Sequence, residues 1–191
     1  MRTAKTVLTV IQERGKQKKP IERVYKLLFN RELYLNAYAK LYPNNGAMTK
    51  GVTNETVDGM SIQKIDRMIE ILREEKYQWK PARREYIKKK NGKKRPLGIP
   101  VWGDKVLQEV MRQILEAYYE PQFSEHSHGF RPNRGCHTAL QEIQVWKGTR
   151  WFIEGDISQY FDTIDHKILL EILARNIHDG RFIRLVSNML E

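Results

Sequence analysis

The stretch TRWFIEGDISQYFDTIDH, residues 149–166, decides how this sequence is interpreted. Its apolar run from Trp151 to Ile153 predicts a buried strand that leads into acidic residues. A carboxylate at the end of such a strand, here Asp156, is costly to bury unless something neutralises it. A divalent cation can do so, and Mg²⁺ favours one or two carboxylates together with substrate phosphates. For this stretch by itself, an aspartate that caps a turn or a helix is the simpler interpretation.

Helical patterns surround this stretch. The spacing of apolar residues predicts helices over 21–42, 62–72, 104–119, 136–146, 166–176 and 179–190, with Ser61 and Asp165 as caps of the second and fifth. A long loop rich in Gly, Asn and Thr separates the first two, from Pro43 to Ser61. The last helix reaches residue 191 without a stop signal, so the natural protein is expected to continue. The fold class expected is α+β and rich in helix.

A basic hairpin is predicted between residues 82 and 100, ARREYIKKKNGKKRPLGIP, with its turn at Asn91-Gly92. Eight cations lie here against the single acid Glu85: Arg83, Arg84, Lys88, Lys89, Lys90, Lys93, Lys94 and Arg95. Lysines can keep an edge hairpin soluble. They can also hold a triphosphate or a nucleic-acid backbone. Pro96, Gly98 and Pro100 stiffen the second strand, which favours the binding role.

The composition fits a polyanionic partner. Lys and Arg number 34 against 23 Asp and Glu, giving a net charge of +11. A soluble surface that happens to be basic explains the charge equally well. No stretch approaches the ~20 apolar residues of a membrane span. The single cysteine, Cys136, excludes an intrachain disulfide, suits a reducing compartment and is expected to pack against neighbours.

The order of these pieces resembles a known family. KKKNGKKRPLGIP, then DKVLQEVMRQILEAYYEPQFSEHSHGFRPNRGCHTAL, then WFIEGDISQYFDTIDH resemble the first blocks of bacterial group II intron-encoded reverse transcriptases, also called maturases. The loop GAMTKGVTNETVDGMS resembles the N-terminal extension loop of that family. The resemblance implies the fingers and partial palm of a right-hand polymerase, with an acidic palm strand. Residues 1–80 would form N-terminal extension helices and a template-contacting loop, 81–148 the fingers, and 149–191 the truncated start of the palm.

The resemblance also implies an activity, the addition of dNTPs to a primer by two-metal phosphoryl transfer. Asp156 would be catalytic and bind Mg²⁺ together with the backbone carbonyl of Ile157. Phe161 would be the steric gate that excludes a ribose 2′-hydroxyl, and Gly129, Phe130 and Arg131 would help to shape the pocket. The residues expected to bind the dNTP or its base pair are Lys89, Arg95, Phe161, Arg83 and Ile99. Those expected to bind nucleic acid are Lys50, Lys88, Lys90, Arg131 and Arg134.

One departure limits this expectation. The second acidic pair of the family, in a Tyr-Ala-Asp-Asp motif, is absent from the sequence. Because one aspartate cannot hold two metal ions, this chain alone is expected not to polymerise DNA. An RNA-binding maturase module that assists splicing without catalysis is the main alternative. A scaffold with a decayed site is another, although the presence of Asp156, Phe161, Lys89 and Arg95 together argues against it.

The partners implied are group II intron RNA, an RNA template with a DNA primer, and dNTPs. No membrane is expected, and a homodimer stays open. The expected location is the bacterial cytoplasm or an organelle.

Overall fold

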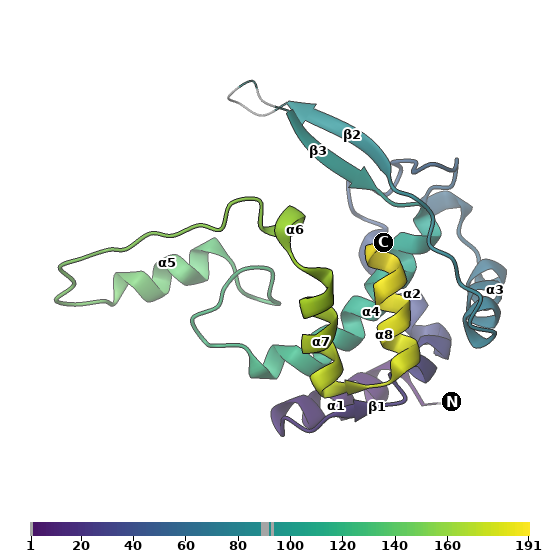
Figure 1. Cartoon of the computed structure of the whole chain (residues 1–191), viewed down its shortest axis with the longest axis horizontal. Coiled ribbons are helices and arrows are strands. Elements are labelled where there is room, and N and C mark those ends of the chain that lie inside the picture. Colours follow the sequence, from purple (N-terminus) through teal and green to yellow (C-terminus); the bar gives the residue numbers. More distant parts are fainter. Residues whose placement is uncertain (1, 89–91, 93) are drawn as a thin grey trace.

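One long helix, α4 (Trp102–Tyr119), forms the centre of the computed structural model, which describes residues 2–88, 92 and 94–191. Helices α1 (Ala4–Lys16) and α2 (Arg31–Leu41) pack against it (Figure 1). Val106, Leu107, Val110 and Ile114 of α4 are fully buried. Because these residues recur at three- and four-residue spacing, they place one face of α4 in the core, as the sequence predicts.

Helix α1 approaches α4 closely at a glycine. A β-carbon added at Gly15 would lie 2.0 Å from the carbonyl oxygen of Tyr118. Any other residue would therefore force the two helices apart. Thr3 caps α1 by accepting a hydrogen bond from the backbone N–H of Thr6. No helix is predicted here from the sequence, although Ala4, Val7, Leu8 and Ile11 recur at three- and four-residue spacing.

The segment from Ile21 to Tyr42 is not one helix, so that prediction is wrong. It contains a short strand β1 (Ile21–Glu22), the 3-10 helix η1 (Val24–Phe29), and α2. Two residues interrupt the helix: Arg23 adopts a left-handed conformation with φ of 55°, and Asn30 is extended. Asn30 is buried and accepts a hydrogen bond from the N–H of Glu32 while donating one to the carbonyl of Arg2. An asparagine satisfied in this way favours a cap over a helix interior.

The C-terminal elements of the described chain pack against its N-terminal elements. Helices α7 (His166–Asn176) and α8 (Gly180–Leu190) flank the short strand β4 (Ile177–His178), which pairs in parallel with β1. Asp179 caps α8 and also accepts a hydrogen bond of 2.9 Å from the N–H of Tyr25. Trp79 donates from its indole to the carbonyl of Leu185. These contacts join α8 to the N-terminal core.

The predicted hairpin is confirmed. Strands β2 (Arg83–Lys88) and β3 (Lys94–Ile99) pair in antiparallel register, with Arg83 opposite Ile99 and Lys88 opposite Lys94. Gly92 has a φ of 78°, which suits the glycine of a tight turn. Asn91, the other residue of the predicted turn, lies outside the described residues. Figure 1 shows the hairpin extending away from the helices.

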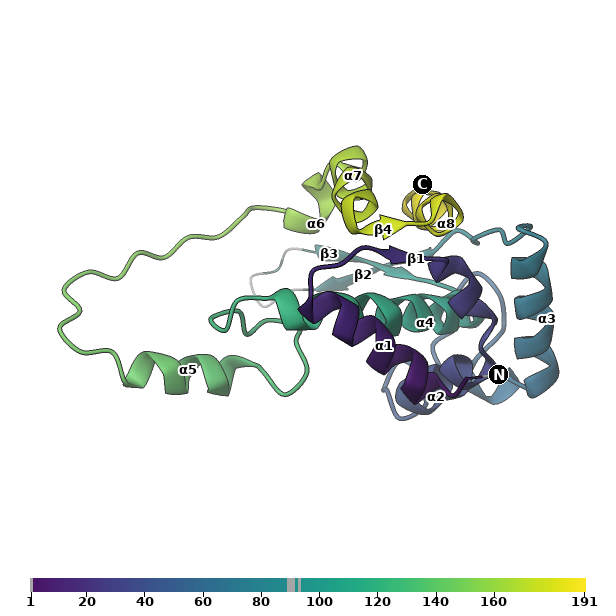
Figure 2. The same ribbon diagram turned by 90° about the horizontal axis from the view of Figure 1, so that it is seen from below.

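A long arm carries α5 (Cys136–Gln144) away from the core and returns to it at α6 (Tyr160–Thr163), which lies beside α7 (Figure 2). The strand predicted at Trp151–Ile153 is wrong for this structure, because residues 151–157 have no strand assignment and Trp151 and Ile153 are 86% and 94% exposed. A strand needs a neighbour for its backbone hydrogen bonds, and no part of the described chain pairs with this segment. Cys136 is also exposed, which contradicts its expected packing role.

Helices α3 (Ile62–Arg73) and α7 agree with the sequence patterns. Ser61 caps α3, and Asp165 caps α7 by accepting from Lys167 and Ile168. The 3-10 helices η2 (Val57–Gly59) and η3 (Glu120–Gln122) lie in the loops before α3 and after α4. Within the described ranges, no helix is long and apolar enough to cross a membrane. The division into three domains stays a prediction.

Candidate nucleic-acid and nucleotide site

The base of the hairpin is fixed to the long loop between Pro43 and Ser61. Arg83 donates from Nε to the carbonyl of Lys50 at 3.0 Å and forms an ion pair with Glu85. The next residue, Gly51, approaches Pro100 and Val101 so closely that a β-carbon would lie 2.9 Å from their backbone atoms. Lys105 adds a hydrogen bond to the carbonyl of Thr49. The loop is therefore held against the hairpin from two sides.

The two faces of the hairpin carry different side chains. Residues directly opposite in an antiparallel pair share a face, and alternate residues along a strand do so too. The observed register therefore places Arg83, Ile99 and Arg95 on one face. Lys88 and Lys94 lie opposite each other on the other face, and both are exposed. Lys89 and Lys90, also predicted to bind ligand, lie outside the described residues.

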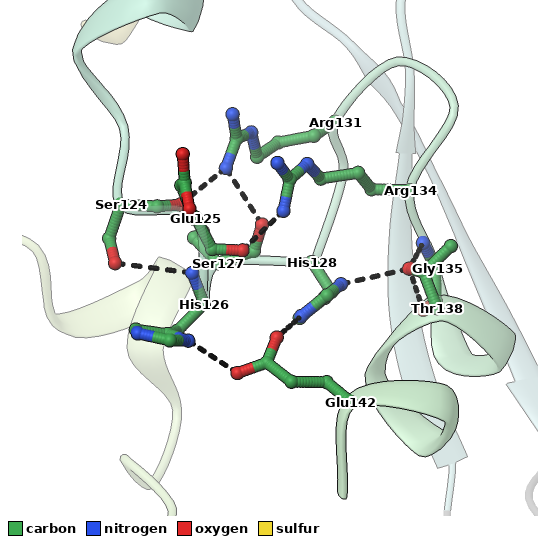
Figure 3. A network of polar contacts seen from close by, with 10 residues as sticks. All are labelled: Ser124, Glu125, His126, Ser127, His128, Arg131, Arg134, Gly135, Thr138 and Glu142. Atoms are coloured by element: carbon green, nitrogen blue, oxygen red, sulfur yellow. Dashed lines mark hydrogen bonds and ion pairs between the residues drawn. The ribbon is translucent and has the colours of Figure 1, made fainter. Parts of the chain in front are cut away.

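Arg131 lies in the loop GFRPNRG, residues 129–135, and its side chain reaches toward the segment from Ser124 to Ser127 (Figure 3). Its guanidinium forms an ion pair of 2.9 Å with Glu120 and donates to the carbonyls of Ser124 and Ser127. Only 8% of the side chain is exposed. The geometry therefore shows Arg131 ordering the loop, and its contact with nucleic acid stays a prediction.

The neighbouring loop residues are more accessible. Arg134 donates to the carbonyl of Glu125, and Phe130 is 99% exposed with a φ of 56°. A non-glycine residue in the left-handed region is uncommon and carries strain. The buried Arg131 holds this loop in place while the ring of Phe130 faces outward.

A second set of polar contacts connects the same loop to α5. Glu142 binds His126 through one carboxylate oxygen and His128 through the other, the latter at 2.8 Å (Figure 3). His128 also contacts the hydroxyl of Thr138 at 2.8 Å. Hydrogen bonds from His128, and then from His126, lower the pKa of Glu142 below its usual value. We refer to His126, His128, Thr138 and Glu142 as the histidine clamp.

The sequence prediction missed the histidine clamp and Glu120. A signal was present, because Thr138 and Glu142 are four residues apart and so share one face of α5. The two histidines immediately precede GFRPNRG. Their pairing with Glu142 depends on how the loop folds back, and residue spacing does not reveal that.

Asp156 lies in the exposed arm. Within the described ranges it makes no side-chain hydrogen bond or ion pair, and the adjacent Ile157 is 66% exposed. Phe161 begins α6 together with Tyr160, with ring centroids 5.3 Å apart, and is 74% exposed. Gln159 precedes them in a left-handed conformation with φ of 51°. In both Figure 1 and Figure 2, α6 lies near the hairpin.

The donor set for a metal ion is incomplete. Asp156 and the carbonyl of Ile157 supply oxygen ligands of the type that Mg²⁺ prefers, but octahedral Mg²⁺ takes about six. Across residues 2–88, 92 and 94–191, no cluster of three or more His, Cys, Asp or Glu side chains could hold a metal ion. The residues present therefore fit one edge of a Mg²⁺ site.

A family model described as reverse transcriptase (RNA-dependent DNA polymerase) matches residues 87–190. This match covers more than half of the chain, from the hairpin to α8. The chain belongs to the reverse transcriptase family.

Within that family, the chain is similar to proteins whose names refer to introns. It is 48% identical over 171 residues to the group II intron-encoded protein LtrA of Lactococcus lactis subsp. cremoris. This alignment covers 88% of the present chain and 28% of LtrA. It is 46% identical to an uncharacterized 91 kDa protein in the cob intron of Schizosaccharomyces pombe, over 98% of this chain and 24% of that protein. The mitochondrial nuclear intron maturase 1 of Arabidopsis thaliana is 36% identical over 48% of this chain and 13% of its own length. The chain thus spans about a quarter of the first two relatives.

Proposed function

We propose that this chain supplies the fingers and the first metal-binding carboxylate of an RNA-directed DNA polymerase encoded by a group II intron. The observation that carries the proposal is the arrangement of charge on the hairpin. Lys88 faces Lys94 directly across the strands. Like charges in such a pair are destabilising, and a bound polyanion would offset that repulsion. A hairpin that needed lysine only for solubility would not require this pairing.

The two hairpin faces suit different parts of the substrate. Arg95 shares a face with Arg83 and Ile99. Ile99 is buried and Arg83 pairs with Glu85, so Arg95 would be the cation of this face that meets a triphosphate, with Arg83 and Ile99 beneath the base pair. Arg95 can bind a phosphate with two parallel hydrogen bonds. Lys89 would add a further cation to this binding. On the other face, Lys88 would meet the template backbone, with Lys50, Lys90 and Arg134 extending that contact. Lys50 is supported by its position beside the hairpin, where its backbone carbonyl accepts a hydrogen bond from Arg83.

Asp156 and the carbonyl of Ile157 would hold Mg²⁺ together with ligands from outside this chain. When bound, two such ions stabilise the attacking and leaving oxygens of phosphoryl transfer. The exposed ring of Phe161, five residues further on, is free to contact the sugar of an incoming nucleotide. A ring at that position would exclude a ribose 2′-hydroxyl and so select dNTPs.

Primer extension by a chimaera tests the proposal. This chain would replace the aligned 171 residues of the Lactococcus lactis protein. We expect Asp156→Asn to reduce extension on an RNA template by more than about 100-fold, because loss of a metal ligand should exceed the effect of outer-shell changes. Asp165→Asn is the matched control, since asparagine also caps helices well and extension should be retained. Equal activity of the two variants would refute the role of Asp156.

The chain by itself gives the complementary test. With one carboxylate available, we expect the purified chain to show no extension of a DNA primer on an RNA template. Extension that disappears on Asp156→Ala would show that the site is complete without a second acidic pair.

A maturase role is the second candidate, supported by the match to an intron maturase and by the net charge of +11. Lys50→Glu in the chimaera separates the two roles. If intron RNA binding falls while primer extension survives, the loop serves the intron, whereas loss of both assigns the loop to the template. Lys26→Glu, on η1, is the control of equal charge. Binding should weaken with salt, with a log–log slope of about −0.7 to −0.9 per phosphate contact.

The relatives support a proposal for the cellular location. Some are bacterial and others are mitochondrial by their printed names. We place the protein in the bacterial cytoplasm or an organelle, where an RNA template with a DNA primer, dNTPs and group II intron RNA would be its partners.

A further inference from the structure

A cavity of about 460 Å³ lies between α3, the segment after it, and the first turn of α4. It has no role in the polymerase proposal. Figure 2 shows α3 at the opposite end of the molecule from the arm that carries Asp156. Volumes of this size are typical of small-ligand pockets.

Four cations surround the cavity: Lys64, Arg67, Lys76 and Lys80. Lys64 pairs with Glu55 at 3.0 Å, and Lys76 with Glu74 at 3.0 Å. Among the described residues, the side chains of Arg67 and Lys80 have no carboxylate partner. They are therefore available to an anion that enters the cavity.

The other acid of the wall, Asp104, is already satisfied. Its carboxylate accepts 2.6 Å and 3.0 Å hydrogen bonds from the Tyr77 hydroxyl and from the backbone N–H of Lys80. Burial, and then the bond to Asp104, raise the pKa of Tyr77, so its hydroxyl stays a neutral donor. The repulsion that Asp104 exerts on an anion is reduced by these two donors.

The N-terminus of α4 opens on the same cavity. This helix has 18 residues, and its cap residue, Val101, offers no side-chain hydrogen bond. The backbone N–H groups of Trp102 and Gly103 consequently have no partner within the helix, and both residues line the cavity. The helix dipole adds partial positive charge at this end.

An independent observation concerns Trp102. This residue is among those that line the cavity and is 3% exposed. Its ring contacts Tyr38 and Lys105, yet its indole Nε1 has no hydrogen-bond partner in the part of the chain that the structure describes. Buried polar groups are almost always paired. Met60, Met68 and Tyr77 complete an apolar wall beside it. Methionine and aromatic side chains suit the face of a planar ring.

We propose that this cavity binds a single nucleotide with a terminal phosphate. The phosphate lies between Arg67, Lys80 and the N-terminus of α4, and the base lies against Met68 and Tyr77. The ligand can be a free nucleoside monophosphate or the 5′-phosphorylated end of a strand, since both present the same phosphate and base.

Calorimetry on the 191-residue chain at constant salt tests this, with AMP, adenosine and inorganic phosphate as probes. We expect AMP to bind at least about tenfold more tightly than either part, because only AMP uses both the cations and the apolar wall. In ¹⁵N-labelled protein, AMP should shift the Gly103 amide and the Trp102 indole signals. No AMP binding, or equal binding of phosphate and AMP, would overturn the proposal.

Charge reversal locates the site. Arg67→Glu and Lys80→Glu should each weaken AMP binding by about tenfold or more, while Lys147→Glu, an exposed control in the arm, should leave it unchanged within about twofold. Circular dichroism checks the fold. If Arg67→Glu does not fold, the affinity of Lys80→Glu for AMP tests the site. This variant should fold, because residue 80 bonds to Asp104 through its backbone N–H, which the substitution keeps. Equal affinities of all three variants would contradict the assignment.

A short RNA separates the two sources of ligand. Tighter binding of a 5′-phosphorylated tetranucleotide than of AMP identifies a strand end, and the reverse order identifies the free nucleotide. If 5′-hydroxyl and 5′-phosphate tetranucleotides bind equally, the phosphate is not recognised and the proposal fails.

Discussion

Glu142 shows how a single carboxylate can order a loop. It joins two histidines that precede GFRPNRG to a helix that follows it. Because the contacts lower the pKa of Glu142, they favour its ionised form in the folded protein. Their stabilising contribution is complete above the ordinary carboxyl pKa and is lost as the pH falls through the lowered pKa of the folded state.

We expect the loop to loosen in acid before the core unfolds. Backbone amide signals of residues 126–128 should change between about pH 6 and pH 3, on either side of the usual Glu pKa near 4.3. Glu142→Gln should produce similar changes already at pH 6 and remove much of the pH dependence. Glu171→Gln, an exposed acid of α7, should leave the signals unaltered. A titration that Glu142→Gln does not alter would exclude the histidine clamp as its origin.

Local chemistry made several residues predictable. Ser61 and Asp165 were identified as caps because each needs only the N–H groups that follow it. The burial of Arg131 could not be predicted from its position in a basic loop, since it depends on Glu120, eleven residues earlier. The same limit applies to Trp102, whose unpartnered indole could be recognised only after α3 and α4 had been placed together.

At the scale of elements, the contact between α1 and α4 depends on the absence of a side chain at Gly15. We expect Gly15→Ala to destabilise the protein by about 1–3 kcal/mol, the usual cost of overpacking, because the new β-carbon meets backbone. Thermal or urea unfolding measures this. Gly46→Ala is the control, since no atom lies within 4 Å of its added β-carbon. Equal stabilities of the two variants would show that α1 can move away from α4 without cost.

Elements differ in how far their partners lie along the chain. The hairpin was predictable because its strands and turn are contiguous, and α4 because its apolar stripe is self-contained. The apolar run at Trp151–Ile153 matches a strand pattern, but pairing needs a neighbouring strand, and the described chain provides none there. The break between Ile21 and Tyr42 arises at Arg23 and Asn30, where tertiary contacts override an apolar spacing that also suits a helix.

For the whole molecule, the helix-rich α+β class and the family followed from the sequence. The family was predicted from the order of three motifs, and the match of the family model to residues 87–190 confirms it. Which residues contact a ligand stays a prediction. The hairpin, the GFRPNRG loop and Asp156 lie in separate parts of the structure, and Asp156 itself lies in the exposed arm. In the same way, charge alone predicted a polyanionic partner but could not locate the cavity beside α3.

The bond between Tyr25 and Asp179 has a consequence for synthesis of the protein. Its partners are 154 residues apart, and β1 must wait for β4 over a similar separation. At about 5–20 residues per second, a ribosome needs about 8–30 s to make that length. During this interval, Ile21 and Tyr25 are exposed to solvent on the side that later packs against β4 and α8. Nascent chains should therefore attract chaperones until β4 and α8 emerge, and they should release them soon afterwards.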